Sequence, residues 1–461
     1  MNYTFTLQQK HYNRLLEHLL RDDGKERAAF IISGIARTNE EVRYLSRKVI
    51  CLDEAMLLSN SHTHVSFDNN HFIKALKEAE AKGFSVTLVH NHPSNVRDFS
   101  TTDDEGERNL FQLAFNRNKD RNPYPSLILF PDGDLIGRVW NEDLHHYPIT
   151  KIRIIGKEIK LMYPDRNDFF ESKDEFNRQA LAFGDALNQD LQNLKVAIVG
   201  CGGTGSAVAM LIARLGIKEI CLIDKDKFAK SNINRLHGST LDDIDVPKVD
   251  IIEREILRLG LETKVTKVKD WVDNEDAINE LKSSDVIFGC TDDHVGRILL
   301  NRLAYFYLIP VIDMGLIIKV NDSIPPKMID LTNRISYLFP GSDCLLTNKT
   351  INLDIAHAES IRRNDPNEYE KLKEEAYVMG EGNPAPSIVT FTTQVATLAV
   401  NSLLNRLVQF NSTALHSHEI NMIHRNIQLC PGNKVDNDCR ICGFDSYWGR
   451  GDMEPFLDMT R

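Results

Sequence analysis

The feature that most constrains the fold is a glycine-rich turn between an apolar strand and an apolar helix. Residues 195–199 are largely apolar and β-branched, which predicts a strand, and residues 206–215 place apolar side chains at helical spacing. The turn between them fits the pattern G-x-G-x-x-G, with glycines at Gly200, Gly202, Gly203 and Gly205. Because these residues lack side chains, backbone N–H groups and the helix N-terminus can approach a phosphate closely. The turn therefore predicts a nucleotide site in an α/β sheet.

A second predicted strand supports this interpretation. Residues 219–223 are followed by Asp224, which lies about 20 residues beyond the turn, where this layout places a ribose-binding acid. The glycine pattern alone is also typical of a plain strand-to-helix connection. The acid and the flanking elements therefore carry the nucleotide prediction.

Charged side chains follow the predicted strand ends, where an open α/β sheet forms its ligand crevice. Arg235 and Lys248 lie in polar surroundings, and Asp292 follows the apolar strand 285–288. Cations neutralise the charge that grows as pyrophosphate leaves, and an Asp can hold the magnesium that bridges the phosphates. A dehydrogenase needs no such set, because it holds pyrophosphate without cleaving it. A lone Lys or Arg is more often a solvated surface charge, but the shared position after strand ends favours triphosphate chemistry.

Several motifs at matching spacing resemble the ThiF/MoeB/ubiquitin-activating (E1-like) adenylyltransferase family. They lie at residues 176–179, 200–205, 224–226, 231–235, 247–248 and 291–293. The resemblance implies a Rossmann-like, doubly wound domain over residues 173–429. It further implies use of ATP and Mg²⁺ to adenylate the C-terminal carboxylate of a ubiquitin-like protein, in some members followed by capture on an enzyme cysteine.

The resemblance also assigns roles to individual residues. Asp224 would bind the ribose, Asn232, Arg235 and Lys248 the phosphates, and Asp292 the magnesium, with Arg235 and Lys248 counted as catalytic. In the family, the equivalents of Arg178 and often Arg235 reach the neighbouring subunit's site, which implies a homodimer. The full predicted ATP-binding set is Arg178, Gly200, Gly202, Gly203, Gly205, Asp224, Asp226, Asn232, Arg235, Lys248 and Asp292.

The N-terminal third carries an independent group of residues. An apolar strand at 84–89 leads into His90-Asn91-His92-Pro93, and Ser100 and Asp103 follow. Two His at alternate positions and an Asp supply three zinc ligands and leave the fourth position for water. Such a zinc lowers the pKa of its water toward about 7, and a nearby carboxylate can then remove the proton. Ser100 can donate a hydrogen bond to the developing oxyanion.

The pattern H-x-H-P followed by S-x-x-D resembles the JAB/JAMM (MPN) metalloprotease family, an α/β fold, over residues 1–145. The resemblance makes His90, His92 and Asp103 the zinc ligands, and Ser100 and Glu26 catalytic. Glu26 precedes the strand that ends in Gly34, although its separation from Gly34 is one residue longer than the family pattern. The similar spacing His62-Thr63-His64 lacks the Pro and the Ser/Asp that would follow, so we predict that both His lie on the surface.

The cysteines indicate a second metal site. The pair Cys439 and Cys442 resembles half of the structural zinc site of the E1-like family, and the other half would contain Cys344. Thr347 stands where the partner of Cys344 is expected. Two alternatives follow. In the first, zinc binds Cys344 and the C-terminal pair, with Cys430 as a further candidate ligand. In the second, no zinc binds and Cys344 is free to form a thioester. A structural zinc needs four ligands, so the C-terminal pair alone is insufficient. Of the two alternatives we favour zinc.

Length, composition and charge bound the class of protein. The 461 residues, 42% of them hydrophobic, predict two or three domains: 1–145, a hairpin and linker at 146–172, 173–429, and a cysteine-containing tail at 430–461. No apolar stretch is long enough to span a bilayer and no signal pattern opens the chain, so we expect a cytoplasmic protein without a membrane partner. The net charge of -11 argues against a nucleic-acid partner.

The sequence therefore predicts an α/β enzyme in which a zinc peptidase is fused to an ATP-dependent activating domain. Its predicted partners are a ubiquitin-like protein and, as a further candidate, a conjugating enzyme. Such fusions resemble bacterial ubiquitin-like conjugation systems, some of them linked to phage defence. The alternative substrate is a small peptide or a sulfur-carrier protein, with the N-terminal domain as a release protease or a docking module.

Overall fold

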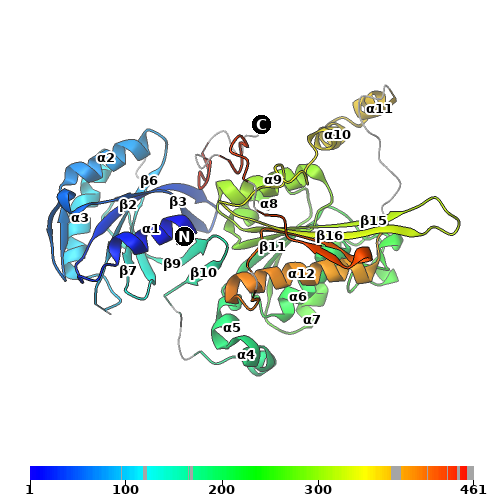
Figure 1. Cartoon of the computed structure of the whole chain (residues 1–461), viewed down its shortest axis with the longest axis horizontal. Coiled ribbons are helices and arrows are strands. Elements are labelled where there is room, and N and C mark those ends of the chain that lie inside the picture. Colours follow the sequence, from blue (N-terminus) through cyan, green and yellow to red (C-terminus); the bar gives the residue numbers. More distant parts are fainter. Residues whose placement is uncertain are drawn as a thin grey trace. The chain divides into compact units, whose positions relative to one another are not determined.

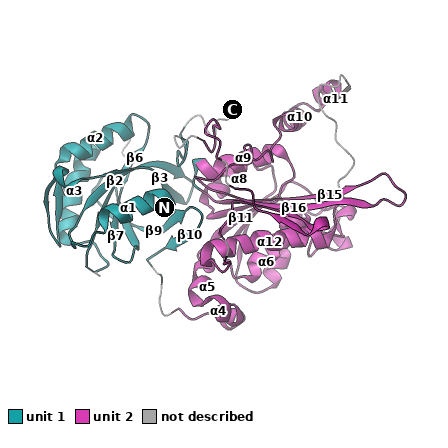
Figure 2. Ribbon diagram, viewed as in Figure 1, with its two compact units in different colours: residues 1–167, 306–308, 445–461 teal, residues 168–305, 309–444 magenta. Residues whose placement is uncertain are grey.

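The chain forms two compact units in the computed structural model. The described residues are 1–461 except 95, 118–121, 165, 167–169, 375–385, 413, 433–434, 444–446 and 454–461. The first unit comprises residues 1–167, 306–308 and 445–461, and the second comprises residues 168–305 and 309–444 (Figure 2). Among the described helices, none has the length and apolar character needed to cross a membrane.

The first unit is built on a sheet that closes on itself, because β1 pairs with both β3 and β9. In spatial order its strands are β1 (Asn2–Gln8), β3 (Glu41–Cys51), β2 (Ala28–Arg37), β6 (Ser85–Asn91), β7 (Tyr124–Leu129), β8 (Leu135–Trp140), β9 (His146–Ile155) and β10 (Ile159–Met162). A separate hairpin joins β4 (Leu57–Asn60) to β5 (Val65–Phe67). The β9–β10 hairpin, which the sequence places in the linker, is part of this sheet.

Two apolar clusters fill the first unit. One gathers side chains of β1, β2, β3 and β9 around α1 (Gln9–Leu19), including Phe5, Leu7, Leu15 and Leu19. The other packs α2 (Asn69–Glu80) and α3 (Thr101–Arg117) against β2 and β6 through Phe30, Phe72 and Phe111. The closed sheet thereby buries both of its faces. This fixes α3 beside the end of β6.

The second unit contains the doubly wound sheet. In spatial order its strands are β13 (Lys264–Val268), β12 (Glu219–Ile223), β11 (Lys195–Val199), β14 (Val286–Gly289), β15 (Val311–Val320), β16 (Met328–Leu338), β17 (His418–Met422) and β18 (Ile427–Leu429). The strands β13 to β15 are parallel, and β16 to β18 are antiparallel additions. The strand order reverses at β11, which pairs with β12 on one side and β14 on the other. Such a switch point is where α/β sheets bind ligands.

Helices cover both faces of this sheet. Figure 1 shows α8 (Glu275–Ser283) and α9 (His294–Phe306) on one face, and α6 (Gly203–Arg214), α7 (Lys248–Arg258) and α12 (Val389–Val408) on the other. The remaining helices are α4 (Asn177–Phe183), α5 (Asp185–Gln192), α10 (Leu353–Asn364) and α11 (Pro366–Glu374). The predicted Rossmann-like fold of this unit is confirmed. The predicted strands at 195–199, 219–223 and 285–288 correspond to β11, β12 and β14.

The C-terminal tail is divided between the units. Residues up to 443 belong to the second unit, whereas the described residues 447–453 belong to the first. Gly451 forms a parallel bridge with Ile35, and the N–H of Arg37 donates to the Asp452 carboxylate at 2.6 Å. The predicted tail 430–461 is therefore not one structural element.

Candidate functional sites

The glycine turn brings three backbone segments into close contact. A Cβ at Gly205 would lie 1.8 Å from the carbonyl oxygen of Gly200, and a Cβ at Gly200 would lie 2.8 Å from that of Cys290. Gly200 also has φ of +90°, a conformation that glycine adopts without strain. Side chains at these two positions would prevent the packing. The turn is therefore a close cradle at the N-terminus of α6, suited to a phosphate.

The acids after β12 form the wall next to this cradle. The Asp224 carboxylate accepts hydrogen bonds from the N–H groups of Cys201 (2.6 Å) and Asp226 (2.7 Å). Burial raises the pKa of Asp224, and the charge of Lys248 partly offsets this effect. Lys248 is ion-paired with Asp226 at 2.7 Å, and Lys225 with the same acid at 2.8 Å. Lys248 is thus held at the N-terminus of α7, beside the predicted ribose site.

Arg235 also lies at the cradle. A Cβ at Gly203 would come within 3.2 Å of the Arg235 side chain, which therefore crosses the first turn of α6. Its guanidinium donates to the carbonyl of Ser231 at 2.7 Å. Asn232 instead accepts the N–H of Ala229 at 3.0 Å. Arg235 therefore lies at the turn, whereas the Asn232 side-chain oxygen accepts a hydrogen bond from the local backbone.

Two adjacent aspartates after β14 have different environments. The Asp293 carboxylate accepts hydrogen bonds from Thr291 Oγ1 and the N–H of Gly296, which closes the start of α9. The Asp292 side chain is exposed and makes no hydrogen bond or ion pair with a described residue. Asp292 is therefore the acid of this pair that can take a magnesium ion.

The structure leaves the role of Arg178 open and adds Asp313, which the sequence did not single out. Arg178 is exposed on α4, so its predicted role in a neighbouring subunit's site stays a prediction. Asp313 of β15 is fully buried and pairs with Arg334 (2.5 Å) and Arg297 (3.3 Å). A Cβ at Gly289 would lie 3.1 Å from an Asp313 oxygen, which places this acid beside the end of β14. Sequence reasoning missed it, although an Asp inside an apolar strand signals a paired charge.

The two histidines and Asp103 converge in the first unit. His90 Nε2 lies 3.2 Å from His92 Nε2, and the Asp103 oxygens lie 3.2 and 3.3 Å from the two nitrogens. Two ligand atoms at about 2.05 Å from a tetrahedral zinc are about 3.3 Å apart. The three side chains are mostly buried and come from the end of β6 and the first turn of α3. The observed spacing fits a zinc ion.

Glu26 lies near the same site, just before β2. The strands β2 and β6 are antiparallel, and the N–H of Asn91 donates to the carbonyl of Arg27 at 3.2 Å. The Glu26 carboxyl, one residue before Arg27, lies within range of the charges of His90, His92 and Asp103. Burial raises the pKa of the Glu26 carboxyl, and the charges of the neighbouring histidines partly offset this effect.

Ser100 lies at the N-terminus of α3 and contacts one of the predicted ligands. Its hydroxyl donates to an Asp103 oxygen at 2.7 Å, and its N–H donates to the same oxygen at 2.7 Å. Ser100 therefore fixes the orientation of Asp103. The hydroxyl therefore lies next to one of the predicted zinc ligands. Its predicted catalytic role stays a prediction.

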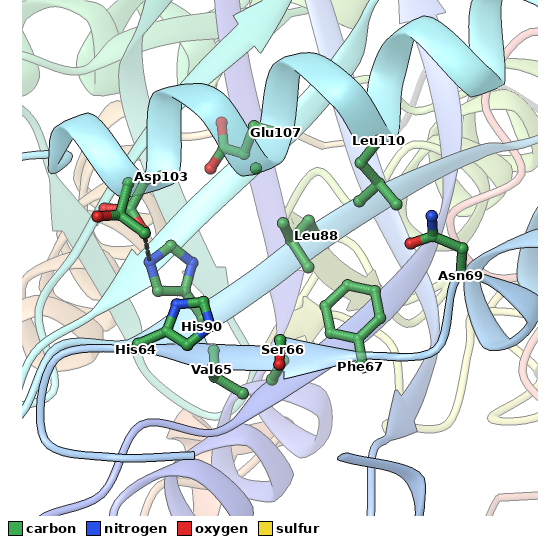
Figure 3. A pocket seen from close by; sticks show the side chains of 13 residues that line it. His64, Val65, Ser66, Phe67, Asn69, Leu88, His90, Asp103, Glu107 and Leu110 are labelled. Carbon is green, nitrogen blue, oxygen red and sulfur yellow. Dashed lines mark ion pairs between the residues drawn. The ribbon is translucent and has the colours of Figure 1, made fainter. Parts of the chain in front are cut away.

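A pocket next to this cluster contains one residue that sequence reasoning left out. The pocket is lined by His90 and Asp103 and also by His64, which precedes β5 (Figure 3). Both His62 and His64 are exposed, as predicted, and His62 contacts the carbonyl of Gly24 at 2.7 Å. The sequence held no signal for the position of His64, because the hairpin that carries it is distant from His90 in the chain.

The cysteines form the second cluster. Cys344 Sγ lies 3.7 Å from Cys439 Sγ, and the Thr347 hydroxyl lies 3.5 Å from Cys344 Sγ and 3.1 Å from Cys442 Sγ. Sulfur atoms at about 2.3 Å from a tetrahedral zinc are about 3.8 Å apart. The three thiols thus fit three zinc ligands, and the Thr347 hydroxyl lies beside them where a fourth thiol would stand. Cys430 is exposed and is not among the grouped ligands.

This arrangement bears on the two alternatives for Cys344. Its side chain is fully buried and lies in contact with Cys439. A thioester would require access for the tail of a protein substrate. The geometry therefore favours Cys344 as a ligand over Cys344 as the catalytic cysteine.

Replacing Cys439 and Cys442 by Ser should lower the zinc content by one ion per chain, measured by atomic absorption. It should also lower the melting temperature by about 5 °C or more, because a bound metal stabilises the folded state by mass action. The matched control is Cys430→Ser, which removes an exposed thiol outside the cluster. Thr347→Cys should tighten zinc binding, since it supplies a fourth thiolate. Unchanged zinc content in the double variant would contradict the site.

Comparisons with known proteins agree with the geometry of the second unit. Residues 176–441 match the sequence model of the ThiF family. The chain is 29% identical over 152 residues to the adenylyltransferase and sulfurtransferase UBA4 of Debaryomyces hansenii, covering 32% of this chain and 34% of that protein. It is 29% identical over 139 residues to the sulfur carrier protein ThiS adenylyltransferase of Escherichia coli, covering 30% and 55%.

A third relative and one solved structure also match part of the chain. The tRNA threonylcarbamoyladenosine dehydratase of Bacillus subtilis is 37% identical over 95 residues, covering 21% of this chain and 37% of that protein. The crystal structure of E. coli MccB with MccA-N7isoASN has a TM-score of 0.46 at 20% identity and covers 59% of this chain and 76% of that one. The chain thus spans between 34% and 55% of the length of these curated relatives.

Proposed function

We propose, from the premise that this chain belongs to the ThiF family, that its second unit adenylates the C-terminal carboxylate of a ubiquitin-like or sulfur-carrier protein. The observation that carries the proposal is the convergence of the glycine cradle with Asp224, Arg235 and Lys248 at the switch point of the sheet. The ThiS adenylyltransferase of E. coli is named for this class of substrate. The tRNA-directed relative names a different substrate, so the comparisons leave the substrate open.

The approach of Gly205 to Gly200 leaves no room for side chains there, which supports a turn whose backbone N–H groups receive phosphates. In the proposed reaction Asp224 holds the ribose, and the N-terminus of α6 receives the phosphates. Arg235 and Lys248 neutralise charge on the leaving pyrophosphate. Asp292 holds a magnesium ion, which supplies charge neutralisation when bound.

The decisive experiment is ATP–pyrophosphate exchange with the full chain and candidate ubiquitin-like proteins. We expect exchange only when a partner with a free C-terminal carboxylate is present. A partner truncated by two residues and a partner with an amidated C-terminus are the matched controls. Exchange that proceeds equally with these controls would rule out adenylation of a terminal carboxylate. Sedimentation of the same samples tests the proposed homodimer.

For the first unit we propose a zinc peptidase that trims the activated partner or removes it from targets. The supporting observation is that the His90, His92 and Asp103 ligand atoms have the spacing of a tetrahedral zinc. A zinc ion bound there would supply a Lewis acid that makes water nucleophilic near neutral pH. Glu26 would accept the proton of that water, and Ser100 would orient Asp103 and face the substrate carbonyl.

The two activities are compatible with one substrate. A protein tail that is longer than needed must be trimmed before its carboxylate can be adenylated, and a conjugate must be hydrolysed before the protein can be reused. We therefore propose one ubiquitin-like partner for both units. A conjugating enzyme would be the acceptor after activation. Incubating a tail-extended partner with zinc-loaded chain, followed by mass spectrometry, tests the trimming step.

A further inference from the structure

The pocket beside the proposed zinc site has walls from several elements. His90 and Asp103 form one part, and residues 64–67 form another (Figure 3). The rest includes Ala28, Leu88, Asn69, Gly106, Glu107 and Leu110. Figure 3 shows His90 and Asp103 toward one end and Asn69 toward the other, with Leu88, Leu110 and Phe67 between them. The pocket thus begins at the ligand cluster and continues into an apolar interior.

The interior of the pocket favours an uncharged occupant. Leu88 and Leu110 are buried, and Phe67 packs edge-on against Phe30 with ring centroids 5.3 Å apart. The buried Glu107 accepts hydrogen bonds from Arg138 (2.8 Å) and Trp140 (2.7 Å). Its charge is therefore already neutralised and does not attract a basic side chain. An aliphatic side chain would instead displace water from apolar surface.

We propose that this pocket receives an aliphatic side chain of the peptide substrate, carried by a residue next to the cleaved bond. The inference rests on the proposed peptidase activity and specifies its substrate. Because His90 and Asp103 belong both to the cluster and to the pocket wall, a side chain in the pocket must lie near the carbonyl at the metal. The reaction is hydrolysis: water adds to that carbonyl, the C–N bond breaks, and the amine leaves with a proton.

Gly106 offers a way to close the pocket without damaging the fold. It lies on α3 in the pocket wall, and a Cβ at this position would meet no atom within 4 Å. A side chain at Gly106 therefore starts in open space at the pocket wall, and we expect Gly106→Leu to narrow the pocket. The substitution also replaces a poor helix former by a good one within a helix, so α3 should not be weakened.

The test uses the full zinc-loaded chain and fluorogenic peptides that differ only in having Gly, Ala or Leu on either side of the cleaved bond. We expect kcat/KM to favour Leu over Gly by about 10–200-fold at one of the two positions, the range that apolar pockets give. Gly106→Leu should lower kcat/KM for the Leu peptide at least tenfold and leave that for the Gly peptide within twofold. Gln112→Leu, on the exposed face of α3, is the matched control and should leave both values unchanged.

A binding measurement separates the pocket from the chemistry. In the Glu26→Gln background, fluorescence anisotropy should show weaker binding of the Leu peptide after Gly106→Leu, with unchanged zinc content. If the wild-type chain cleaves no peptide, the peptidase proposal fails, and this binding measurement still decides the pocket. Equal cleavage of Leu and Gly peptides, or Leu-peptide affinity that Gly106→Leu does not weaken, would overturn the inference.

Discussion

Replacing Asp292 by Asn should lower ATP–pyrophosphate exchange by about 10²–10³-fold, the effect of removing one preorganised electrostatic group from a transition state. The Asp292 carboxylate is exposed at the end of β14 and has no hydrogen-bond or ion-pair partner among the described residues. Its proposed contribution is therefore to magnesium and not to folding. Thermal unfolding of the variant should match that of the wild-type chain, and exchange rates at saturating ATP and Mg²⁺ measure the loss.

The adjacent Asp293 provides a stringent control. Its carboxylate accepts hydrogen bonds from Thr291 and Gly296 at the start of α9, so its role is structural. Asp293→Ala should cost about 1 kcal/mol of stability, the usual effect of losing a helix cap, and should retain most of the exchange activity. If Asp293→Ala abolished exchange while Asp292→Asn kept it, the assignment of the magnesium ligand would be reversed.

The sequence signals of the predicted nucleotide crevice are local. A strand, a glycine turn and a helix follow one another directly, and Asp224 and Asp292 each come just after an apolar strand. Parallel strands bring their carboxyl ends to one edge, so this order of elements predicts a shared crevice. The Asp313 pair with Arg334 was not predicted, because it depends on the antiparallel register between β15 and β16.

Features that depend on long-range packing were not accessible from the sequence. The contact of Cys344 with Cys439 joins segments that are distant in the chain, so the sequence alone left the choice between ligand and thioester open. The same holds for the tail, of which residues up to 443 belong to the second unit and residues 447–453 to the first. Sequence spacing gives the identity of such residues but not their partners.

Glu26 lies near the predicted zinc ligands although its sequence spacing is unusual. Its separation from Gly34 departs from the family pattern, which placed its role in question at the level of sequence. In the structure, β2 pairs with β6 from Ala28 to Ser33, and Glu26 lies two residues before this pairing begins, within range of the charges of His90 and His92. The unusual spacing therefore does not separate the carboxylate from the cluster.

Glu26→Gln should accordingly lower peptide cleavage by about 10²–10⁴-fold, the usual contribution of a positioned general base. The zinc content should not change, because the three ligand side chains remain. His92→Ala should instead lower zinc by one ion per chain and abolish cleavage. Cleavage of a tail-extended partner and atomic absorption on the same samples measure both effects.

The matched control is Glu54→Gln, which changes a carboxylate that is 69% exposed and pairs with Arg27 at 3.4 Å. It should leave cleavage within about twofold, because surface ion pairs contribute little to stability. Loss of zinc in Glu26→Gln would mean that this acid holds the metal and does not act as the base. Full activity in Glu26→Gln would show that another group accepts the proton, whereas absence of cleavage by the zinc-loaded wild-type chain would leave the first unit as a docking module.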